Sequence, residues 1–409
     1  MKRQIFIIGG GPAGMMAAIT AARNGAAVTI LEHNDRIGKK ILSTGNGRCN
    51  FTNMNQSSKY YRSDNKGFPW KVIEKFPFKD TLAFFEELGI YAKEKNGGLY
   101  PFSEQASAVL DVLRMEIERL HIPAITGENV CDLKVVKKEF QIVCKNNTYK
   151  ADAVILAAGS KASSKLGSDG SGYLLAKKLG HRIVPVVPAL VQLKCKESFY
   201  KALAGVRLQG KVCLLVNGKE VSSDAGEIQL TAYGISGIPV FQVSRFASRA
   251  IYEKKRVEAV LDFMPSFSEK EFSDYIYRRI ELRPEKNMED FFTGMLNKKV
   301  AQVVLKIANI RNTQKSGTLG ENEIIRLVKT VKEFRTEVTE ANSFEQAQVC
   351  AGGVDTKDIS SKTMESLLVK NLYFAGEIVD VDGICGGYNL QWAWSSGYLA
   401  GKGAAHAEN

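Results

Sequence analysis

The chain opens with a strand, a glycine turn, a helix and a second strand that ends in an acid. The apolar run at residues 5–8 is typical of a buried parallel strand. Gly9, Gly11 and Gly14 follow this run in GxGxxG spacing. In such a turn the first glycine permits the tight bend, the second lets a phosphate approach the backbone, and the third lets the helix pack on the strand. The spacing therefore predicts a Rossmann-type nucleotide-binding unit.

The helix and the second strand add two further requirements of a dinucleotide site. The helix begins near Pro12, and its N-terminal N–H groups and dipole are expected to face a pyrophosphate. Small side chains such as that of Ala13 keep this helix close to the sheet. Glu32 ends the second strand, where a carboxylate accepts hydrogen bonds from both hydroxyls of an adenosine ribose. The same carboxylate would repel a 2′-phosphate, so we expect no NADP at this position.

The other end of the chain contains a second segment of nucleotide-binding character. Residues 371–401 have the pattern of a strand, a glycine-rich acidic loop and a helix. A chain that begins and ends in this way is predicted to hold FAD in one site formed by both segments, and its cofactor is able to carry out redox chemistry.

Length and composition limit the classes of protein that remain. With 409 residues the chain is long enough for two or three domains. Its longest apolar run is shorter than the roughly 20 residues of a membrane span, and glycines interrupt the N-terminal stretch, unlike in a signal peptide. Seven cysteines without CxxC spacing and four histidines without ligand spacing predict neither a disulfide scaffold nor a metal site. We expect a cytoplasmic protein.

The net charge of +12 at pH 7 has three interpretations. It reflects a solvated lysine-rich surface, a field that steers anionic substrates or NAD(P)H to the protein, or a surface that binds nucleic acid. The sequence contains no dense Lys/Arg run with interleaved aromatic residues. We therefore expect a small-molecule substrate and no nucleic-acid partner.

A change of pattern after about residue 189 indicates an inserted domain. The nucleotide-binding pattern occupies residues 1–189 and resumes in residues 343–409. The insert, 190–342, has three parts in sequence: β-rich residues 190–265, helical residues 266–314 and β-rich residues 315–342. We predict an α/β fold in which a discontinuous Rossmann-like domain is interrupted by a β-rich and helical domain.

Six motifs occur in order along the chain, and the long ones are specific: GGGPAG, GKKILSTGNGRCNFTN, AAGS, GSDGSGYLLAKKLGH, AGGV and YFAGEIVDVDGICGGYNLQWAWSSG. Together they resemble the BaiN and aminoacetone oxidase family of flavoproteins. The match covers both nucleotide-binding segments, whereas the insert is supported mainly by its position and length. The resemblance implies a glutathione-reductase-like FAD domain, a β-barrel and helical insert, and non-covalent FAD.

The resemblance also implies roles for individual residues. Lys40 would help on the adenosine side, Val130 would lie near the adenine, and Glu377 would hold the ribityl chain or a phosphate-bound water. The N-terminus of the last helix would stabilise the negative charge that develops on the flavin pyrimidine on reduction. The predicted cofactor-binding residues are Gly9, Gly11, Pro12, Ala13, Gly14, Glu32, Lys40, Thr44, Gly45, Asn46, Arg48, Cys49, Asn50, Val130, Ala158, Gly159, Gly376, Glu377, Gly387, Tyr388, Asn389 and Leu390.

Two residues are candidates for catalysis. Arg48 lies inside a glycine-rich loop, where it binds substrate or pairs with a glutamate or a phosphate. Tyr388 donates a proton to a substrate carbon or packs as an aromatic ring. Cys49 and Cys385 lack a CxxC partner and are interpreted as packing residues.

The predicted function is that of an FAD-dependent oxidoreductase. Some relatives in the resembling family are described as NAD(P)H-dependent reductases of conjugated double bonds in 3-oxo bile acids, and others as oxidases of small amines. We predict reduction of a conjugated C=C bond in a 3-oxo steroid or bile-acid-like substrate. Because the sequence has a single GxGxxG, NAD(P)H would be a transient electron donor. The alternatives are an aminoacetone-like amine oxidase that forms hydrogen peroxide and a flavin-containing RNA-modification or interaction protein.

Overall fold

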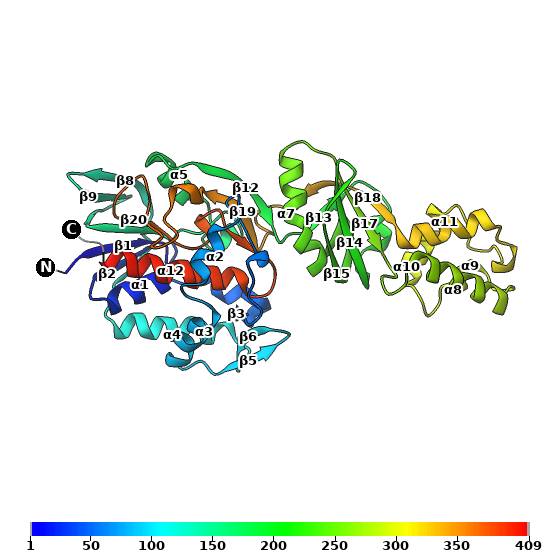
Figure 1. Ribbon diagram of the computed structural model, residues 1–409, viewed down its shortest axis with the longest axis horizontal. Coiled ribbons are helices and arrows are strands. Elements are labelled where there is room, and N and C mark those ends of the chain that lie inside the picture. The colour runs from blue at the N-terminus through cyan, green and yellow to red at the C-terminus, as the bar shows by residue number, and fades with distance from the viewer. Residues whose placement is uncertain (1, 407–409) are drawn as a thin grey trace. The chain divides into compact units, whose positions relative to one another are not determined.

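The computed structural model describes residues 2–406 and divides into two compact units (Figure 1). Unit 1 contains both ends of the chain, residues 1–186 and 348–409, and unit 2 contains residues 187–347. The predicted fold class is confirmed, because the chain has an α/β Rossmann-type domain and a closed β-barrel followed by helices. No helix among the described residues combines the length and apolar character needed to cross a membrane.

A parallel sheet of five strands forms the centre of unit 1. Its strands, in spatial order, are β20 (Leu372–Phe374), β11 (Ala153–Leu156), β1 (Gln4–Ile8), β2 (Ala27–Glu32) and β7 (Ala124–Thr126). Ile5 and Ile7 of β1 are fully buried, and so are their neighbours in β11. Burial on both faces explains why these strands are continuous apolar runs. Since β20 pairs with β11, both ends of the chain contribute to one sheet.

Helices from opposite ends of the chain pack closely in unit 1. Figure 1 shows α1 (Pro12–Arg23, blue) next to α12 (Tyr388–His406, red). A Cβ placed at Gly397 would lie 2.5 Å from the Ala13 carbonyl oxygen, and one at Gly401 would lie 2.4 Å from the Ala17 carbonyl oxygen. At these two positions the backbones of α1 and α12 therefore lie so close together that a side chain on α12 would clash with α1.

The other elements of unit 1 form short helices and small sheets. The helices are α2 (Phe68–Ile73), α3 (Phe78–Glu87), α4 (Ala106–Arg119) and α5 (Ser171–Lys178), with 3₁₀ turns η1 (Lys39–Gly47), η2 (Ser58–Tyr60), η3 (Ser164–Leu166), η5 (Thr356–Asp358) and η6 (Gly376–Ile378). The sheets pair β3 (Thr52–Asn53) with β6 (Gly98–Pro101) and β5 (Ala92–Lys95), β8 (Val130–Val136) with β9 (Glu139–Cys144) and β10 (Thr148–Ala151), β4 (Tyr61–Arg62) with β21 (Asp382–Gly383), and β12 (Ile183–Ala189) with β19 (Val349–Val354).

A two-residue turn joins β5 and β6. Asn96 has φ 52° and Gly97 has φ 82°, and the flanking residues Lys95 and Gly98 are paired. Positive φ at both central residues is the requirement of a type I′ turn, for which Asn-Gly is the preferred sequence. The local sequence thus fixes the register of this hairpin.

Unit 2 contains the closed barrel, in the order β13 (Leu193–Cys195), β16 (Gly234–Gly237), β15 (Lys219–Thr231), β14 (Arg207–Val216), β17 (Val257–Asp262) and β18 (Phe334–Ala341). Val257, Ala259 and Leu261 are buried, whereas the residues between them are partly exposed, as expected when alternate side chains fill a barrel. The remaining elements are α6 (Tyr200–Leu203), α7 (Ile238–Tyr252), α8 (Glu269–Leu282), α9 (Met288–Phe291), α10 (Lys298–Ile307), η4 (Ser316–Thr318) and α11 (Glu321–Lys332).

The prediction of β-rich structure for residues 315–342 is wrong for most of that segment. Helix α11 occupies its centre, and β18 is the strand that follows. The helix buries Ile324, Leu327, Val328 and Val331, which have the spacing of one helical face. At its start, Glu323 accepts a hydrogen bond from the Gly320 N–H at 2.9 Å. The β-branched residues of the segment suggested a strand, but burial of the apolar face of α11 outweighs this local preference and stabilises a helix.

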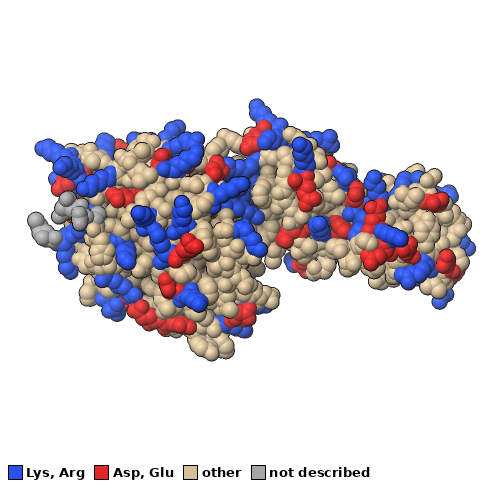
Figure 2. All heavy atoms as spheres, viewed as in Figure 1, with Lys and Arg blue, Asp and Glu red and all other residues tan. Residues whose placement is uncertain are grey.

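Basic side chains are not gathered in a single region of the visible surface. Figure 2 shows Lys and Arg interspersed with Asp and Glu over much of the face in view. The net charge of +12 is therefore distributed over the surface seen there.

The close packing of α1 and α12 predicts a strong effect of one added methyl group. Gly397→Ala should lower the free energy of unfolding by about 1–3 kcal/mol, because the methyl group meets the Ala13 carbonyl rather than a movable side chain. Gly67→Ala is the control, since a Cβ there has no neighbour within 4 Å, and it should change stability by at most about 0.5 kcal/mol. Chemical denaturation of both variants checks this, and equal stabilities would contradict the proposed crowding.

Candidate functional site

The glycine turn has the geometry that a phosphate-binding turn requires. A Cβ at Gly14 would lie 2.0 Å from the Gly9 carbonyl oxygen, and one at Gly9 would lie 2.5 Å from the Ala157 carbonyl oxygen. A Cβ at Gly11, by contrast, meets no atom within 4 Å. Gly9 and Gly14 are therefore needed for packing, whereas Gly11 faces open space at the start of α1. That space allows a phosphate to approach the helix N-terminus.

The turn after β11 lies against the same glycines. A Cβ at Gly9 would lie 2.9 Å from the Cα of Ala158. Gly159 follows with φ 75°, a conformation that favours glycine. The structure thus brings Ala158 and Gly159 to the GxGxxG turn, and their contact with the cofactor remains a prediction.

Glu32 is a buried carboxylate at the end of β2. Its Oε2 accepts a hydrogen bond from the Gly10 N–H at 2.8 Å, and its Oε1 accepts from the backbone and side-chain nitrogens of Asn34 at 2.8 and 2.7 Å. The Glu128 N–H donates to the Glu32 carbonyl oxygen at 3.0 Å, which brings the start of the segment containing Val130 next to Glu32. The acid is held in place beside the turn, where an adenosine ribose would lie.

Lys40 and Glu377 form an ion pair in unit 1. The Lys40 ammonium lies 2.6 Å from Glu377 Oε2, and the Ser160 hydroxyl donates to the same oxygen at 2.9 Å. The sequence analysis expected Lys40 on the adenosine side and Glu377 at the ribityl chain. The ion pair places the charge of Lys40 beside Glu377, the residue expected at the ribityl chain. The role of Lys40 on the adenosine side remains a prediction.

Tyr173 is a residue of this region that the sequence analysis missed. It lies in the first turn of α5, it is buried, and its hydroxyl has no hydrogen-bond partner among the described residues. Burial raises the pKa of Tyr173 well above its usual value, and Cys350, Glu377 and Asp380 add to this effect. The hydroxyl is therefore a protonated donor near Glu377. The only sequence signal was an aromatic residue directly after the glycine-rich loop at 167–172.

The loop at residues 44–50 is built from left-handed backbone. Gly45, Asn46, Gly47 and Cys49 all have positive φ. Cys49 is fully buried, and burial raises the pKa of its thiol to about 12, with the Thr44 side chain opposing the shift. A thiol of this kind is unreactive at neutral pH, as expected for a packing residue.

The glycines before α12 bring this loop to the helix N-terminus. A Cβ at Gly387 would lie 2.7 Å from Asn50 Oδ1 and 2.8 Å from the Thr52 carbonyl oxygen. Asn50 Oδ1 is buried and has no hydrogen-bond partner among the described residues. Asn389 accepts from the Gly383 N–H at 2.8 Å and donates to the Gly383 carbonyl at 3.0 Å, which fixes the loop before the helix.

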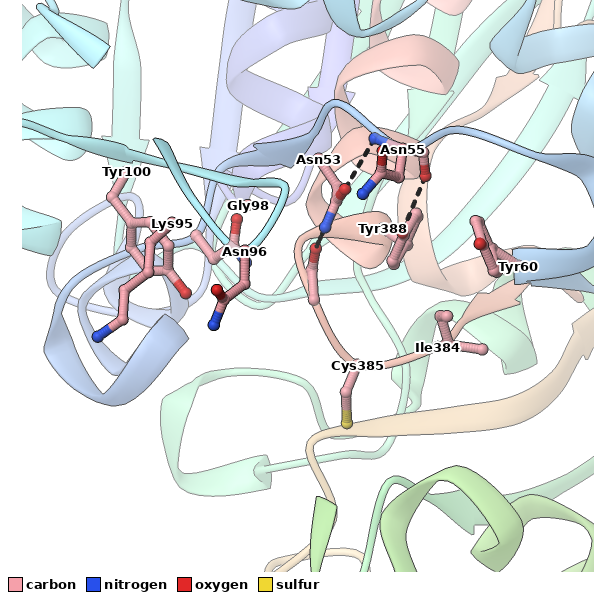
Figure 3. Close-up of a pocket in the computed structure, with 12 residues that line it drawn as sticks. Asn53, Asn55, Tyr60, Lys95, Asn96, Gly98, Tyr100, Ile384, Cys385 and Tyr388 are labelled. Atoms are coloured by element: carbon pink, nitrogen blue, oxygen red, sulfur yellow. Dashed lines mark hydrogen bonds between the residues drawn. The ribbon is translucent and has the colours of Figure 1, made fainter. Parts of the chain in front are cut away.

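A pocket of about 340 Å³ opens beside Asn50 in unit 1 (Figure 3). Its lining residues are Asn50, Asn53, Asn55, Tyr60, Lys95, Asn96, Gly98, Tyr100, Ile384, Cys385, Gly386 and Tyr388. The sequence analysis predicted Asn50 and Tyr388 as site residues and interpreted Cys385 as a packing residue, but it missed the others. Lys95, Asn96, Gly98 and Tyr100 reach the pocket through the pairing of β3 with β6, which the sequence motifs do not specify.

Hydrogen bonds hold the side chains of the pocket in place. The Tyr388 hydroxyl donates to the Asn55 carbonyl oxygen at 2.9 Å, and the Asn53 amide donates to the Gly386 carbonyl oxygen at 2.9 Å (Figure 3). Burial raises the pKa of Tyr388 to about 12, with a smaller contribution from Tyr60. Tyr388 is therefore protonated throughout the neutral range, as a proton donor must be.

Arg48, the other catalytic candidate, lies outside the lining of this pocket. Its side chain is 52% exposed, and its Nε lies 3.8 Å from a carboxylate oxygen of Glu104. Of the two interpretations in the sequence analysis, this geometry favours pairing with a glutamate. An exposed pair at this distance contributes little to stability.

The described residues fit FAD in three respects. The turn at Gly11 leaves space for a phosphate, and the hydroxyl of Tyr173 and the amide oxygen of Asn50 are buried polar groups without partners. Unpaired buried polar groups are rare in folded proteins, and a bound ligand is one way to satisfy them. When bound, FAD would supply hydride chemistry in this region.

The open space at Gly11 predicts a variant that separates cofactor binding from folding. Gly11→Ala should leave the stability of the FAD-free protein within about 0.5 kcal/mol of the original, since the new methyl group meets no atom. FAD affinity should fall roughly tenfold or more, because the methyl group occupies the path of the phosphate. Thermal unfolding and flavin fluorescence titration measure the two effects. Unchanged FAD affinity would place the pyrophosphate elsewhere.

The unpartnered hydroxyl of Tyr173 predicts a different signature. Tyr173→Phe should weaken FAD binding about fivefold and leave the FAD-free protein as stable as before or more stable, since no existing hydrogen bond is lost. Tyr373→Phe is the matched control, because the Tyr373 hydroxyl already donates to the Gly403 carbonyl oxygen. That variant should lose about 1 kcal/mol of stability and keep its FAD affinity. The reverse pattern would remove Tyr173 from the cofactor site.

Comparisons with known proteins identify the family of this chain. Residues 3–403 match the family model described as the HI0933-like protein Rossmann domain. The chain is 44% identical over 404 residues to a 3-dehydro-bile acid delta(4,6)-reductase of Clostridium scindens, covering 98% of this chain and 99% of the relative. It is 29% identical over 399 residues to a ribosomal RNA dihydrouridine synthase of Haemophilus influenzae, covering 96% of each chain. An Escherichia coli protein of the same name is 26% identical over 400 residues, covering 97% of this chain and 96% of the relative. The chain belongs to the HI0933-like family and is an FAD-dependent oxidoreductase.

Proposed function

We propose that this protein reduces a conjugated C=C bond in a 3-oxo steroid or bile-acid-like substrate, with NAD(P)H as the electron donor. The observation that carries this proposal is the 44% identity to the Clostridium scindens reductase over nearly the full length of both chains. A pocket of about 340 Å³ lies next to Asn50 and Tyr388, and we propose that the substrate binds there.

The overall reaction requires two electrons and two protons for each double bond. The chemistry that reduced FAD would supply when bound is hydride transfer to the β-carbon of the enone, and NAD(P)H would provide the two electrons. The protein adds a proton at the α-carbon, so one NAD(P)H and one proton are consumed for each saturated ketone formed. The residues of the pocket have to orient the enone and deliver this proton.

Tyr388 is the residue that we propose as the proton donor. Its hydroxyl lines the pocket and is protonated at neutral pH, since burial raises its pKa to about 12. In the structure this hydroxyl donates its single proton to the Asn55 carbonyl oxygen, so it has to rotate toward the substrate before it can protonate the α-carbon. The amide of Asn53, which lines the pocket beside Tyr388, is suited to donate a hydrogen bond to the substrate carbonyl. Arg48 lies outside this lining, and we assign it to pairing with Glu104.

A second candidate function is the modification of RNA. Two relatives that match almost the full chain are named ribosomal RNA dihydrouridine synthases. Dihydrouridine is uridine reduced at a double bond that is conjugated to a carbonyl, so the two functions share one type of reaction. The net charge of +12 is compatible with an RNA substrate, and the lower identity of 29% and 26% ranks this function second.

An anaerobic titration of the purified protein tests the proposed function. NADH or NADPH should bleach the visible flavin band, and an added 3-oxo-4-ene steroid should restore it while its own enone absorbance disappears. Tyr388→Phe should keep the bleaching step and slow the restoration roughly 10- to 100-fold, because it removes the proposed proton donor. The substitution also removes the hydrogen bond to the Asn55 carbonyl, so the bleaching step and thermal unfolding of the variant serve as controls for an intact site.

Three other results would point elsewhere. Bleaching by an amine, with hydrogen peroxide formed in air, would indicate the amine oxidase instead. Restoration of the flavin band by a uridine-containing RNA but by no steroid would indicate RNA modification, and RNA binding should then weaken steeply with salt. A flavin that neither nicotinamide reduces would require another electron donor.

A further inference from the structure

We infer that Lys95 selects substrates that carry an anionic group, and that this group is a carboxylate of the substrate. The inference rests on the proposed function and extends it to the part of the substrate far from the reacting double bond. It is carried by the charge of the pocket lining, the pairing of the nearby ions and the placement of the β5–β6 hairpin.

The pocket lining is polar but almost uncharged. Among its twelve residues, all of which lie in the described part of the chain, Lys95 alone has a charged side chain. The others include four asparagines and three tyrosines, and the pKa of Tyr388, raised by burial to about 12, keeps that phenol neutral. The lining therefore carries one full positive charge, on the exposed side chain of Lys95, and no negative one.

The acids near Lys95 are already occupied by other groups. Glu104 pairs with the Lys93 ammonium at 2.6 Å and lies 3.8 Å from the Nε of Arg48. Glu94 accepts a hydrogen bond from the Gly97 N–H. The side chain of Lys95, unlike its backbone, forms no hydrogen bond or ion pair with any residue that the structure describes. Its longer-range effect is to lower the pKa of Glu104, after the larger effects of Lys93 and Arg48.

The hairpin gives Lys95 a defined place at the pocket. The Asn96–Gly97 type I′ turn fixes Lys95 opposite Gly98, which also lines the pocket. Figure 3 shows Lys95 and Tyr100 on one side of the pocket and Tyr60, Ile384 and Cys385 on the other. The positive charge is thus separated from the wall that contains Tyr388 and the N-terminus of α12.

This separation indicates the polarity of a bound substrate. The enone would lie toward Tyr388, and an anionic group at the other end of the molecule would lie toward Lys95. A charge-assisted hydrogen bond to an ammonium is typically stronger than a neutral one, and it discriminates against uncharged analogues. A steroid acid would therefore be preferred over its neutral ester.

The test compares 3-oxochol-4-enoic acid with its methyl ester. The dissociation constants of both are measured by perturbation of the flavin absorption band, without electron donor, and their KM values are measured with donor. In Lys95→Met the ratio of acid to ester dissociation constants should rise about tenfold, and the ratio of KM values should follow. Lys95→Arg should restore most of the preference for the acid.

Lys79→Met is the matched control. Lys79 is an exposed lysine of α3 in the same unit, it does not line the pocket, and its loss changes the net charge by the same amount. Its acid-to-ester ratio should stay within about twofold of the original, because a distant exposed charge is screened by salt. An equal shift in both variants would show a general effect of net charge and would overturn the inference.

Other outcomes separate the inference from the proposed function. If Lys95→Met leaves the acid-to-ester ratio unchanged, Lys95 does not bind the substrate carboxylate. If the variant instead weakens NADH or NADPH in the bleaching step, the anion is a dinucleotide phosphate, and the substrate assignment is overturned. If the original protein binds the acid through Lys95 but reduces neither compound, the proposed reductase function fails while the anion-binding role of Lys95 stands.

Discussion

The site depends on the way in which one helix, α12, holds both ends of the chain. The indole N–H of Trp392 donates to the Gly376 carbonyl oxygen at 3.0 Å, and the Gly376 N–H donates to the Ser396 hydroxyl at 2.9 Å. The indole N–H of Trp394 donates to the Phe51 carbonyl oxygen at 2.8 Å. These bonds are buried, so the loss of either indole donor would leave an unpaired carbonyl at a cost of about 1–3 kcal/mol. The two tryptophans therefore do more than fill the core, because they fix the loops next to Glu377 and Asn50.

A buried amide extends this arrangement to the pocket. Gln391 is fully buried and accepts a hydrogen bond from the Thr52 hydroxyl. Its amide nitrogen, with two hydrogens, lies within hydrogen-bonding distance of three acceptors: the Phe76 carbonyl, the Thr81 hydroxyl and the Ser395 hydroxyl. Thr52 begins β3, whose next residue, Asn53, lines the pocket. The start of α12 thus sets the position of the pocket asparagines through a network of satisfied polar groups, which is costly to disturb.

The parts of the site that the sequence predicted are those that a local pattern encodes. The roles of Gly9, Gly11 and Gly14 follow from spacing within a few residues, and the structure gives each glycine the expected surroundings. The asparagines and Lys95 of the pocket come together because β3 pairs with β6, a contact between segments more than 40 residues apart that no motif marks. Helix α11 was missed because β-branched residues favour strands locally, whereas packing of one helical face determined the outcome.

The unpaired groups of unit 1 show how the fold and the cofactor are coupled. Asn50 Oδ1 and the Tyr173 hydroxyl are buried without partners among the described residues, and each such group costs about 1–3 kcal/mol. They lie on segments from different parts of the chain, the loop before β3 and the first turn of α5. A ligand that formed hydrogen bonds with both groups would remove this destabilisation, and it would do so in the folded state alone. The polar groups that lower the free energy of unfolding of the FAD-free protein would therefore be the ones through which bound FAD raises it.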